Sequence, residues 1–219
     1  MSLKITYKKG QSGASPVKQE MTGSGPHAGV NVSDQQIWQE FKKGEDTAYA
    51  FIYKNHAQDL YSYGTSIAND SAFVKDCIHD LFLDLWQRRK KLADVSSIRL
   101  YLFKALRNKI LKEKAKRKPL RAEVEDNYNF QFEYSSESLM IHNQFSEERR
   151  KKLRLALESL TQRQREAIFL KFYKKLSYKE VAAVVGITQK ATYKLLARSI
   201  QMLRNKMISI ILLFLTIFS

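Results

Sequence analysis

The sequence predicts an all-α protein made of two small helical domains joined by a flexible linker, the second domain being a helix-turn-helix. Three observations support this fold class. The 219 residues include only 8 glycines and 3 prolines, and most of these precede residue 30, so strong turn signals are rare in the rest of the chain. Apolar residues recur at helical spacing on both sides of an acidic stretch that lacks such a period. A hydrophobic fraction of 44% is sufficient for a buried core.

Residues 1–32 form the first distinct segment. They are rich in glycine, serine, lysine and glutamine, so we expect a disordered tail. The segment has no apolar stretch of the signal-peptide type. Cys77 is the single cysteine and cannot form an intramolecular disulfide, so nothing points to an oxidising compartment. We therefore expect a cytoplasmic protein.

Residues 33–118 are expected to form the first domain. Helical apolar spacing runs through this segment and is divided by cap residues and helix breakers. The expected boundaries are Ser33, Gly44, Asp46, Asp70, the loop Asp94–Ser97 and Pro119.

A basic run ends the first domain. Between residues 104 and 118 the only acidic residue is Glu113, and the run begins beside Tyr101 and Phe103. Basic residues next to aromatic rings suit single-stranded nucleic acid, because bases stack on the rings while cations neutralise phosphates. The alternative is a solvated helix face whose neighbouring rings belong to the core.

Residues 119–146 separate the two domains. They are acidic and polar without a steady period, which predicts a flexible linker. The formal net charge of the whole chain is +16, and the acidity of this segment leaves the basic charge on the segments at either side. A charge of this size indicates a polyanionic partner, either nucleic acid or an anionic membrane surface.

Residues 147–206 are expected to form the second domain. Within it, Ser177 and Glu180 have capping-box spacing, Gly186 suits a tight turn, and Thr188 can cap a further helix. The last helix would then lie in the DNA major groove and reach base edges and phosphates. Its candidate DNA contacts are Gln189, Lys190, Thr192, Tyr193, Lys194 and Arg198. The alternative is an ordinary αα-hairpin with a solvated basic face.

Residues 207–219 are apolar almost throughout. The segment is short for a membrane span, which needs about 20 residues. We expect it to continue the last helix and pack on the protein or on a partner. The alternative is weak contact with a membrane.

The sequence shows no set of residues for catalysis. No nucleophile is paired with a base, no glycine-rich phosphate loop is present, and the four histidines lack metal-ligand spacing. We therefore expect neither an enzyme nor a bound metal or cofactor.

Several segments resemble the extracytoplasmic-function (ECF) sigma factors of the sigma-70 family. The resemblance rests on segments 41–49, 76–86, 101–108, 160–167 and 177–182, which read FKKGEDTAY, DCIHDLFLDLW, YLFKALRN, LTQRQREA and SYKEVA. It spans about residues 34–118 and 147–206, and the order and spacing of these segments make it specific.

The resemblance implies a role for each surface. Core RNA polymerase would be bound by Asp76, Asp80, Phe82, Leu85 and Trp86. The −10 element would be held open by Ser96, Ser97, Tyr101, Lys104, Arg107, Asn108 and Lys112. The helix from Gln189 would read the −35 element of promoter DNA. The family also implies an anti-sigma factor as a partner.

Two other functions remain open at this point. A stand-alone transcriptional regulator would use the same helix-turn-helix without polymerase. A membrane-surface or interaction protein would use the basic charge on anionic lipid. The segment 76–86 favours the sigma factor, because a stand-alone regulator needs no surface for docking on polymerase.

Overall fold

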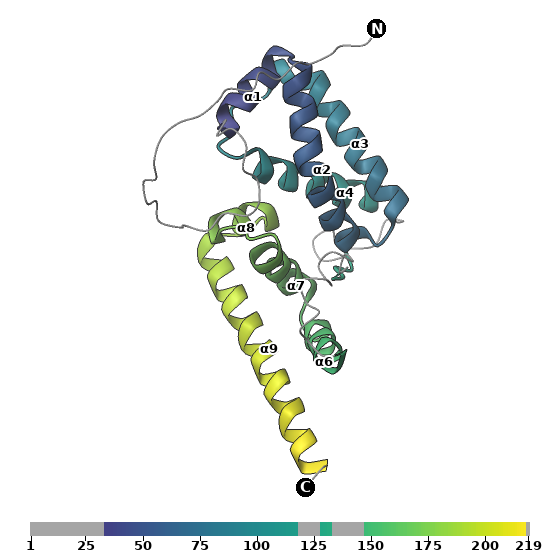
Figure 1. The fold of residues 1–219 in the computed structure, drawn as a ribbon, viewed down its shortest axis with the longest axis vertical. Coiled ribbons are helices and arrows are strands. Elements are labelled where there is room, and N and C mark those ends of the chain that lie inside the picture. Colours follow the sequence, from purple (N-terminus) through teal and green to yellow (C-terminus); the bar gives the residue numbers. More distant parts are fainter. Residues whose placement is uncertain (1–32, 118–127, 133–146, 218–219) are drawn as a thin grey trace, which may run out of the picture. The chain divides into compact units, whose positions relative to one another are not determined.

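The computed structural model describes residues 33–117, 128–132 and 147–217. Their regular secondary structure is helical, which confirms the all-α class (Figure 1). The first set of helices is α1 (Asp34–Lys43), α2 (Asp46–Ala68), α3 (Ser71–Arg88), the 3-10 turn η1 (Arg89–Lys91) and α4 (Ile98–Arg117). The second set is α6 (Glu147–Glu158), α7 (Gln162–Ile168), the π-helical turn η2 (Phe169–Tyr173), α8 (Tyr178–Val185) and α9 (Gln189–Ile217). The tail expected over residues 1–32 lies outside the described residues.

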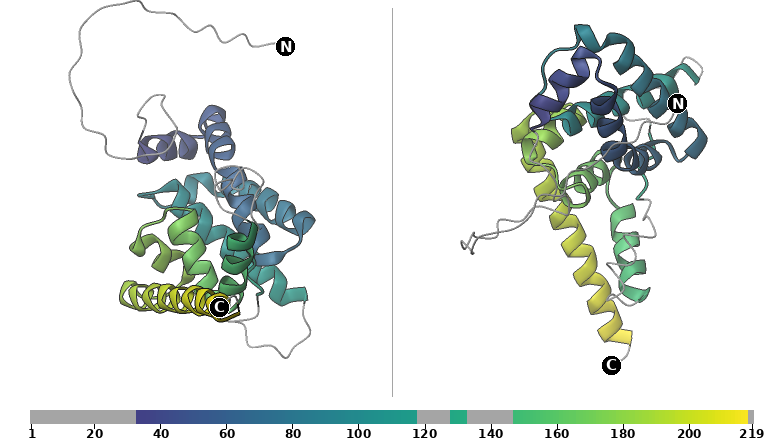
Figure 2. Two further views of the ribbon diagram at one scale, coloured as in Figure 1. Left: turned by 60° about the horizontal axis from the view of Figure 1, so that its bottom comes forward. Right: turned by 45° about the horizontal axis from the view of Figure 1, so that its top comes forward.

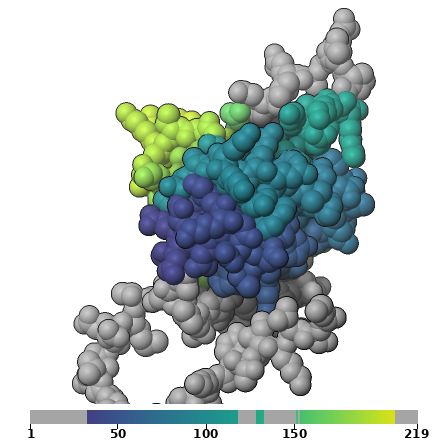
Figure 3. Space-filling model, turned by 90° about the horizontal axis from the view of Figure 1, so that it is seen from above, coloured from purple at the N-terminus to yellow at the C-terminus, as the bar shows by residue number. Residues whose placement is uncertain are grey.

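The first set of helices packs around an aromatic core. α2 contacts both α3 and α4, and α1 packs on α2 and α4. The side chains of Trp38, Phe41, Tyr63 and Phe103 are at most 1% exposed. In the space-filling view, the helices from α1 to α4, coloured purple to teal, meet in a continuous surface over this core (Figure 3).

Caps explain where the helices of the first set begin and end. Ser33 Oγ accepts a hydrogen bond from Gln36 N at 3.2 Å, and Asp70 caps α3 in the same way. Gly44 ends α1 with a φ of 97°, a conformation that favours glycine. The expected cap at Asp46 is wrong, because Glu45 holds the N-cap position and Asp46 is the first residue of α2. Asp46 still suits that place, since a carboxylate in the first turn interacts favourably with the helix dipole.

The second set of helices is organised around α9. α6, α7 and α8 all pack against it, and α6 runs beside it in both views of Figure 2. α7 begins at a capping box in which Thr161 and Gln164 bond each other's backbone N–H groups. α9 continues as far as Ile217, so the backbone of residues 207–217 extends the last helix as expected, whereas the expected packing of this segment stays a prediction. The side chains beyond residue 206 lie outside the description, and no described helix is both long and apolar enough to cross a bilayer.

A short piece of the expected linker is packed into the structure. Tyr128 and Phe130 are at most 1% exposed. Gln131 N donates a hydrogen bond to Ser66 O at 2.8 Å, and Phe130 N donates one to Gln162 Oε1 at 3.0 Å. Residues 128–132 therefore contact both sets of helices. The rest of the linker lies outside the described residues.

Candidate DNA and polymerase interfaces

Caps on both sides of the turn fix the helix-turn-helix formed by α8 and α9. Ser177 Oγ accepts a hydrogen bond from Glu180 N at 3.3 Å, and Glu180 Oε2 accepts one from Ser177 N at 2.8 Å. α8 ends at Gly186, whose φ of 80° favours glycine. Thr188 Oγ1 then accepts a hydrogen bond from Ala191 N at 3.1 Å and caps α9. These interactions match the turn expected from the sequence.

α9 presents a basic face to solvent. Its exposed candidates for DNA contact are Gln189, Lys190, Tyr193, Lys194 and Arg198. No acidic residue occurs between positions 189 and 206. The charge on this stretch of α9 therefore suits the phosphates that flank a major groove.

Thr192 does not belong to the exposed face of α9. Its side chain is fully buried, and its hydroxyl donates a hydrogen bond to the carbonyl oxygen of Thr188 at 3.1 Å. Leu196 and Ser199 are buried on the same side of the helix. In this position Thr192 cannot reach DNA, contrary to its predicted role. Its spacing of four residues from Leu196 is the signal that indicates burial, because residues i and i+4 share a helix face.

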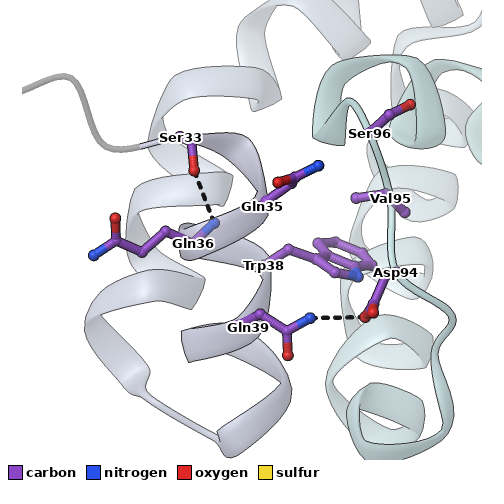
Figure 4. A pocket seen from close by; sticks show the side chains of 8 residues that line it. All are labelled: Ser33, Gln35, Gln36, Trp38, Gln39, Asp94, Val95 and Ser96. Carbon is purple, nitrogen blue, oxygen red and sulfur yellow. Dashed lines mark hydrogen bonds between the residues drawn. The ribbon is translucent and has the colours of Figure 1, made fainter.

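A pocket of about 640 Å³ lies between α1 and the loop that precedes α4 (Figure 4). The Trp38 indole N–H donates to Ala93 O at 3.0 Å, and Asp94 accepts hydrogen bonds from Gln39 at 2.8 Å and Lys42 at 2.6 Å. The hydrogen bond from Lys42, followed by that from Gln39, lowers the pKa of Asp94 below its ordinary value. These contacts fix the loop on α1. The pocket is lined by Ser33, Gln35, Gln36, Trp38, Gln39, Asp94, Val95 and Ser96.

The two serines predicted to act on the −10 element have different surroundings. Ser96 lines this pocket together with several glutamine side chains, whose amides can hydrogen-bond an unpaired base. Ser97 Oγ instead accepts a hydrogen bond from Leu100 N at 3.2 Å, at the start of α4. The glutamines of α1 were not among the predicted site residues, and the loop contacts that place them beside Ser96 join positions more than fifty residues apart.

A second pocket, of about 310 Å³, lies between α3 and α4. It brings together three of the residues predicted to act on the −10 element, Tyr101, Asn108 and Lys112. Tyr101 is half-buried and its ring centroid lies 5.2 Å from that of Trp38. Lys104 is exposed, one helical turn before Asn108 and on the same face of α4. An aromatic ring, an amide and ammonium groups are therefore arranged along one side of this helix.

Arg107 points away from that side of α4. Its side chain is buried and forms an ion pair with Glu166, with Nε 2.8 Å from Oε1 and Nη2 3.3 Å from Oε2. Tyr63 and Tyr128 also donate their hydroxyl hydrogens to the Glu166 carboxylate, which has no exposed surface. We call Tyr63, Arg107, Tyr128 and Glu166 the buried polar cluster. Arg107 cannot contact DNA while this ion pair persists.

The ionisation of the buried polar cluster follows from its geometry. Burial opposes the charged form of Arg107, but the adjacent Glu166 carboxylate outweighs burial and raises the pKa of the guanidinium. Burial, followed by the same carboxylate, raises the pKa of Tyr63 well above its ordinary value. The cluster therefore holds one ion pair and two neutral tyrosine hydroxyls, and all three donor groups point at one carboxylate.

The residues predicted to bind polymerase divide between two sides of α3. Asp76 and Asp80 are exposed, whereas Phe82 and Leu85 are at most 4% exposed and belong to the core. Trp86 is half-buried. Its ring packs against other aromatic rings and against the Arg89 guanidinium, which lies 4.2 Å from the ring centroid. The exposed apolar residue of this helix is Leu83, at 42%, which the sequence prediction omitted.

The described residues contain no group of three or more histidine, cysteine or carboxylate side chains able to hold a metal ion. Cys77 is buried between the helices, and burial raises the pKa of its thiol to about 11. The candidate contacts for DNA are cationic, aromatic and amide groups, and the carboxylates of Asp84 and Glu113 also line the pocket between α3 and α4. Groups of the first three kinds bind nucleic acid by charge, stacking and hydrogen bonding.

A helix-turn-helix with a basic outer face, together with a helical set that has polar pockets, is typical of a DNA-binding protein. Two family models match the chain, "Sigma-70 region 2" over residues 52–119 and "Sigma-70, region 4" over residues 150–203. Together they cover more than half of the 219 residues, so the chain belongs to the sigma-70 family of RNA polymerase sigma factors.

Two solved structures of other proteins are similar to this chain. The structure of CnrH in complex with the cytosolic domain of CnrY has a TM-score of 0.55 and 19% sequence identity, and the match covers 80% of this chain and 97% of that one. The sigma factor RpoE of Bartonella quintana, in complex with the anti-sigma factor NepR, has a TM-score of 0.49 and 19% identity, covering 75% of this chain and 97% of that one. No curated protein sequence matches the chain. The likeness to CnrH supports the helical fold.

Proposed function

We propose that this chain is an ECF-type sigma factor that brings core RNA polymerase to a promoter, opens the −10 element with its first set of helices and reads the −35 element with α9. One observation carries this proposal. A single chain has two separate candidate DNA surfaces, a basic recognition helix on α9 and the pocket between α3 and α4 with its ring and cations. The first suits duplex DNA, and the second suits unpaired bases.

Two surfaces of this kind explain promoter opening without a chemical step. Extruding a base costs a few kcal/mol of stacking and pairing energy. Capture of that base beside Tyr101, with Asn108 to hydrogen-bond it and Lys112 near the phosphates, would offset the cost. Contact between α9 and the −35 duplex would hold the DNA while this happens. The chain would therefore act by binding alone, in line with the non-enzymatic role of sigma factors.

The exposed side of α3 is the proposed polymerase surface. Asp76 and Asp80 offer negative charge there, and Leu83 adds apolar area. Phe82 and Leu85 support this surface from within the core. Their substitution would therefore weaken polymerase binding through loss of stability, rather than through loss of a direct contact.

The family resemblance also leads us to propose a cytoplasmic location and an anti-sigma factor as a protein partner. Weak membrane contact through residues 207–219 stays a prediction, because the side chains of this segment lie outside the described residues.

Run-off transcription with core polymerase on a genomic library tests the proposal. Adding the chain should create start sites that core polymerase alone does not use. The double charge reversal Lys190→Glu/Lys194→Glu should abolish −35-dependent initiation and leave polymerase binding intact. The matched control is Lys43→Glu/Lys54→Glu, which makes the same charge change at exposed positions on α1 and α2.

The outcomes separate the candidate functions. Tight binding to promoter duplex with no effect on polymerase would favour the stand-alone regulator. Binding to anionic liposomes that survives the Lys190→Glu/Lys194→Glu substitution would favour the membrane-surface protein. Equal loss of polymerase binding and initiation in that variant would show misfolding rather than lost recognition.

A further inference from the structure

Two tyrosines stack across the helix-turn-helix. The ring centroids of Tyr178 and Tyr193 lie 4.1 Å apart, and the ring planes are inclined by 20°. Tyr178 is the first residue of α8, and Tyr193 lies in the second turn of α9. The pair therefore connects the N-terminal ends of the two helices. Tyr178 has no role in the recognition surface described so far.

Tyr178 is held in place by its surroundings. The reciprocal hydrogen bonds of Ser177 and Glu180 fix the backbone at the start of α8. Lys171 Nζ lies 4.6 Å from the centroid of the Tyr178 ring, and it is anchored by a hydrogen bond of 3.1 Å to Leu176 O. The ring is half-buried. Tyr178 thus offers a preset surface on which a second ring can lie.

Tyr193 is the partner that faces solvent. It is 49% exposed, and the exposed Lys190 and Lys194 lie next to it on α9. Stacking on Tyr178 covers one face of its ring, so the remaining surface is presented in one orientation. An exposed side chain without such support loses rotamer freedom on binding, which weakens the complex. The stack removes much of that cost before DNA arrives.

The chemistry of the ring indicates which base it can read. Amide and ammonium groups of a recognition helix hydrogen-bond base edges and phosphates, whereas an aromatic surface makes apolar contact. In the major groove, the apolar group that distinguishes one base from the others is the C5-methyl of thymine.

We propose that Tyr193 contacts a thymine methyl group in the −35 duplex and that Tyr178 is the positioning residue that sets the Tyr193 ring for this contact. The inference rests on the proposed function, because it takes α9 as the reader of the −35 element.

Deoxyuridine tests the contact directly, since it lacks only the methyl group of thymine. Holoenzyme assembled from core polymerase and the full chain competes for promoter duplexes taken from the run-off screen, in which each thymine of the −35 element, on either strand, is replaced by deoxyuridine in turn. We expect one position at which the wild-type holoenzyme binds about fourfold more weakly, the effect of one buried methyl group.

Variants separate the contact from its support. Tyr193→Ala should bind the thymine and deoxyuridine duplexes equally at that position. Tyr178→Phe keeps a stacking ring and should keep the fourfold ratio, whereas Tyr178→Leu keeps apolar volume without a ring and should lower the ratio towards one. A ratio measured by competition does not depend on the fraction of active protein, so a partly unfolded variant still gives a valid result.

The results that overturn the inference differ from those that overturn the proposed function. If no thymine position responds although initiation still requires the −35 element, the thymine contact is wrong and the proposed function stands. If Tyr178→Leu keeps the full ratio, or Tyr178→Phe loses it as well, Tyr178 does not position the ring. If the holoenzyme does not depend on a −35 element, the proposed function fails first.

Discussion

At the scale of single residues, the approach of α2 to α3 depends on the absence of a side chain at Gly64. A Cβ at this position would lie 2.6 Å from Cγ1 of Val74 and 3.3 Å from Cδ1 of Ile110. Gly64→Ala should therefore lower the free energy of unfolding by about 1–3 kcal/mol through overpacking, measured by urea denaturation. The double variant Gly64→Ala/Val74→Ala should be less destabilised than the sum of the two single variants, because it removes the clashing methyl groups. Additive effects would contradict this explanation.

Tyr63 is one of the groups that contribute to the response of the protein to alkaline pH. Burial, followed by the Glu166 carboxylate, raises its pKa in the folded state, whereas an unfolded chain has a tyrosine pKa of about 10. Below about pH 10 Tyr63 is protonated in both states and contributes no pH dependence to the stability. Above about pH 10 the unfolded state loses its proton first, so the stability falls by about 1.4 kcal/mol per pH unit for this one group.

The Tyr63→Phe variant isolates that contribution. Urea midpoints measured from pH 8 to pH 11 should fall less steeply for Tyr63→Phe than for the wild type. Tyr53→Phe is the matched control, because it removes a tyrosine hydroxyl from a side chain that is 48% exposed. Equal slopes for Tyr63→Phe and the wild type would show that the hydroxyl of Tyr63 ionises as freely in the folded state as in the unfolded one.

At the scale of helices, α3 has an inner and an outer side with different roles. Asp76→Lys/Asp80→Asn changes exposed side chains and sets no new cation against Lys109, whose Nζ lies 3.7 Å from Asp80 Oδ2, so we expect little change in urea stability and a loss of about tenfold or more in affinity for core polymerase. Leu85→Ala should instead cost about 2–5 kcal/mol of stability, because Leu85 is 4% exposed. Fluorescence anisotropy with labelled chain measures the affinity. Unchanged affinity of the aspartate variant would place the polymerase surface elsewhere.

Local sequence signals predicted the helices better than they predicted which way side chains point. The caps at Ser33, Gly44 and Ser177 depend on nearby backbone groups, so composition and spacing were sufficient. Arg107 was grouped with the basic run by its charge, although its spacing of four residues from the buried Phe103 places it on the core face of α4. The same error was made for Thr192. In both cases helical phase was the better guide than side-chain chemistry.

At the scale of the whole molecule, contacts between distant residues were beyond the reach of the sequence pattern. Tyr128 and Phe130 lie in a stretch without periodicity, and their burial depends on partners in α4, α7 and η2. Glu166 lies 59 positions from Arg107 and 103 from Tyr63. No local rule pairs these side chains. The buried polar cluster is nevertheless one of the contacts that join the first set of helices, the segment 128–132 and α7, beside the ion pair of 2.9 Å between Lys174 and Asp59.

The buried polar cluster should make the two sets of helices unfold together. Glu166→Ala leaves the Arg107 guanidinium buried without a counter-charge, which costs about 3–5 kcal/mol. Both tryptophans, Trp38 and Trp86, lie in the first set, so tryptophan fluorescence reports only that set, whereas far-UV circular dichroism reports all helices. In the wild type the two signals should change at the same urea concentration, because contacts with Glu166 couple the sets.

In Glu166→Ala the dichroism signal should begin to fall at a lower urea concentration than the fluorescence signal, because the second set loses its buried ion pair with α4. Asp84→Ala is the matched control: it removes an exposed carboxylate whose ion pair with Lys109, at 2.8 Å, is worth about 0–1 kcal/mol. That variant should keep the two signals together. Coincident transitions in Glu166→Ala, at a midpoint close to that of the wild type, would mean that the ion pair contributes little and that other contacts, such as the apolar contacts of Tyr128 and Phe130, hold the two sets together.

The outcome also bears on initiation, since Arg107 is available to promoter DNA only in molecules where its ion pair with Glu166 has broken.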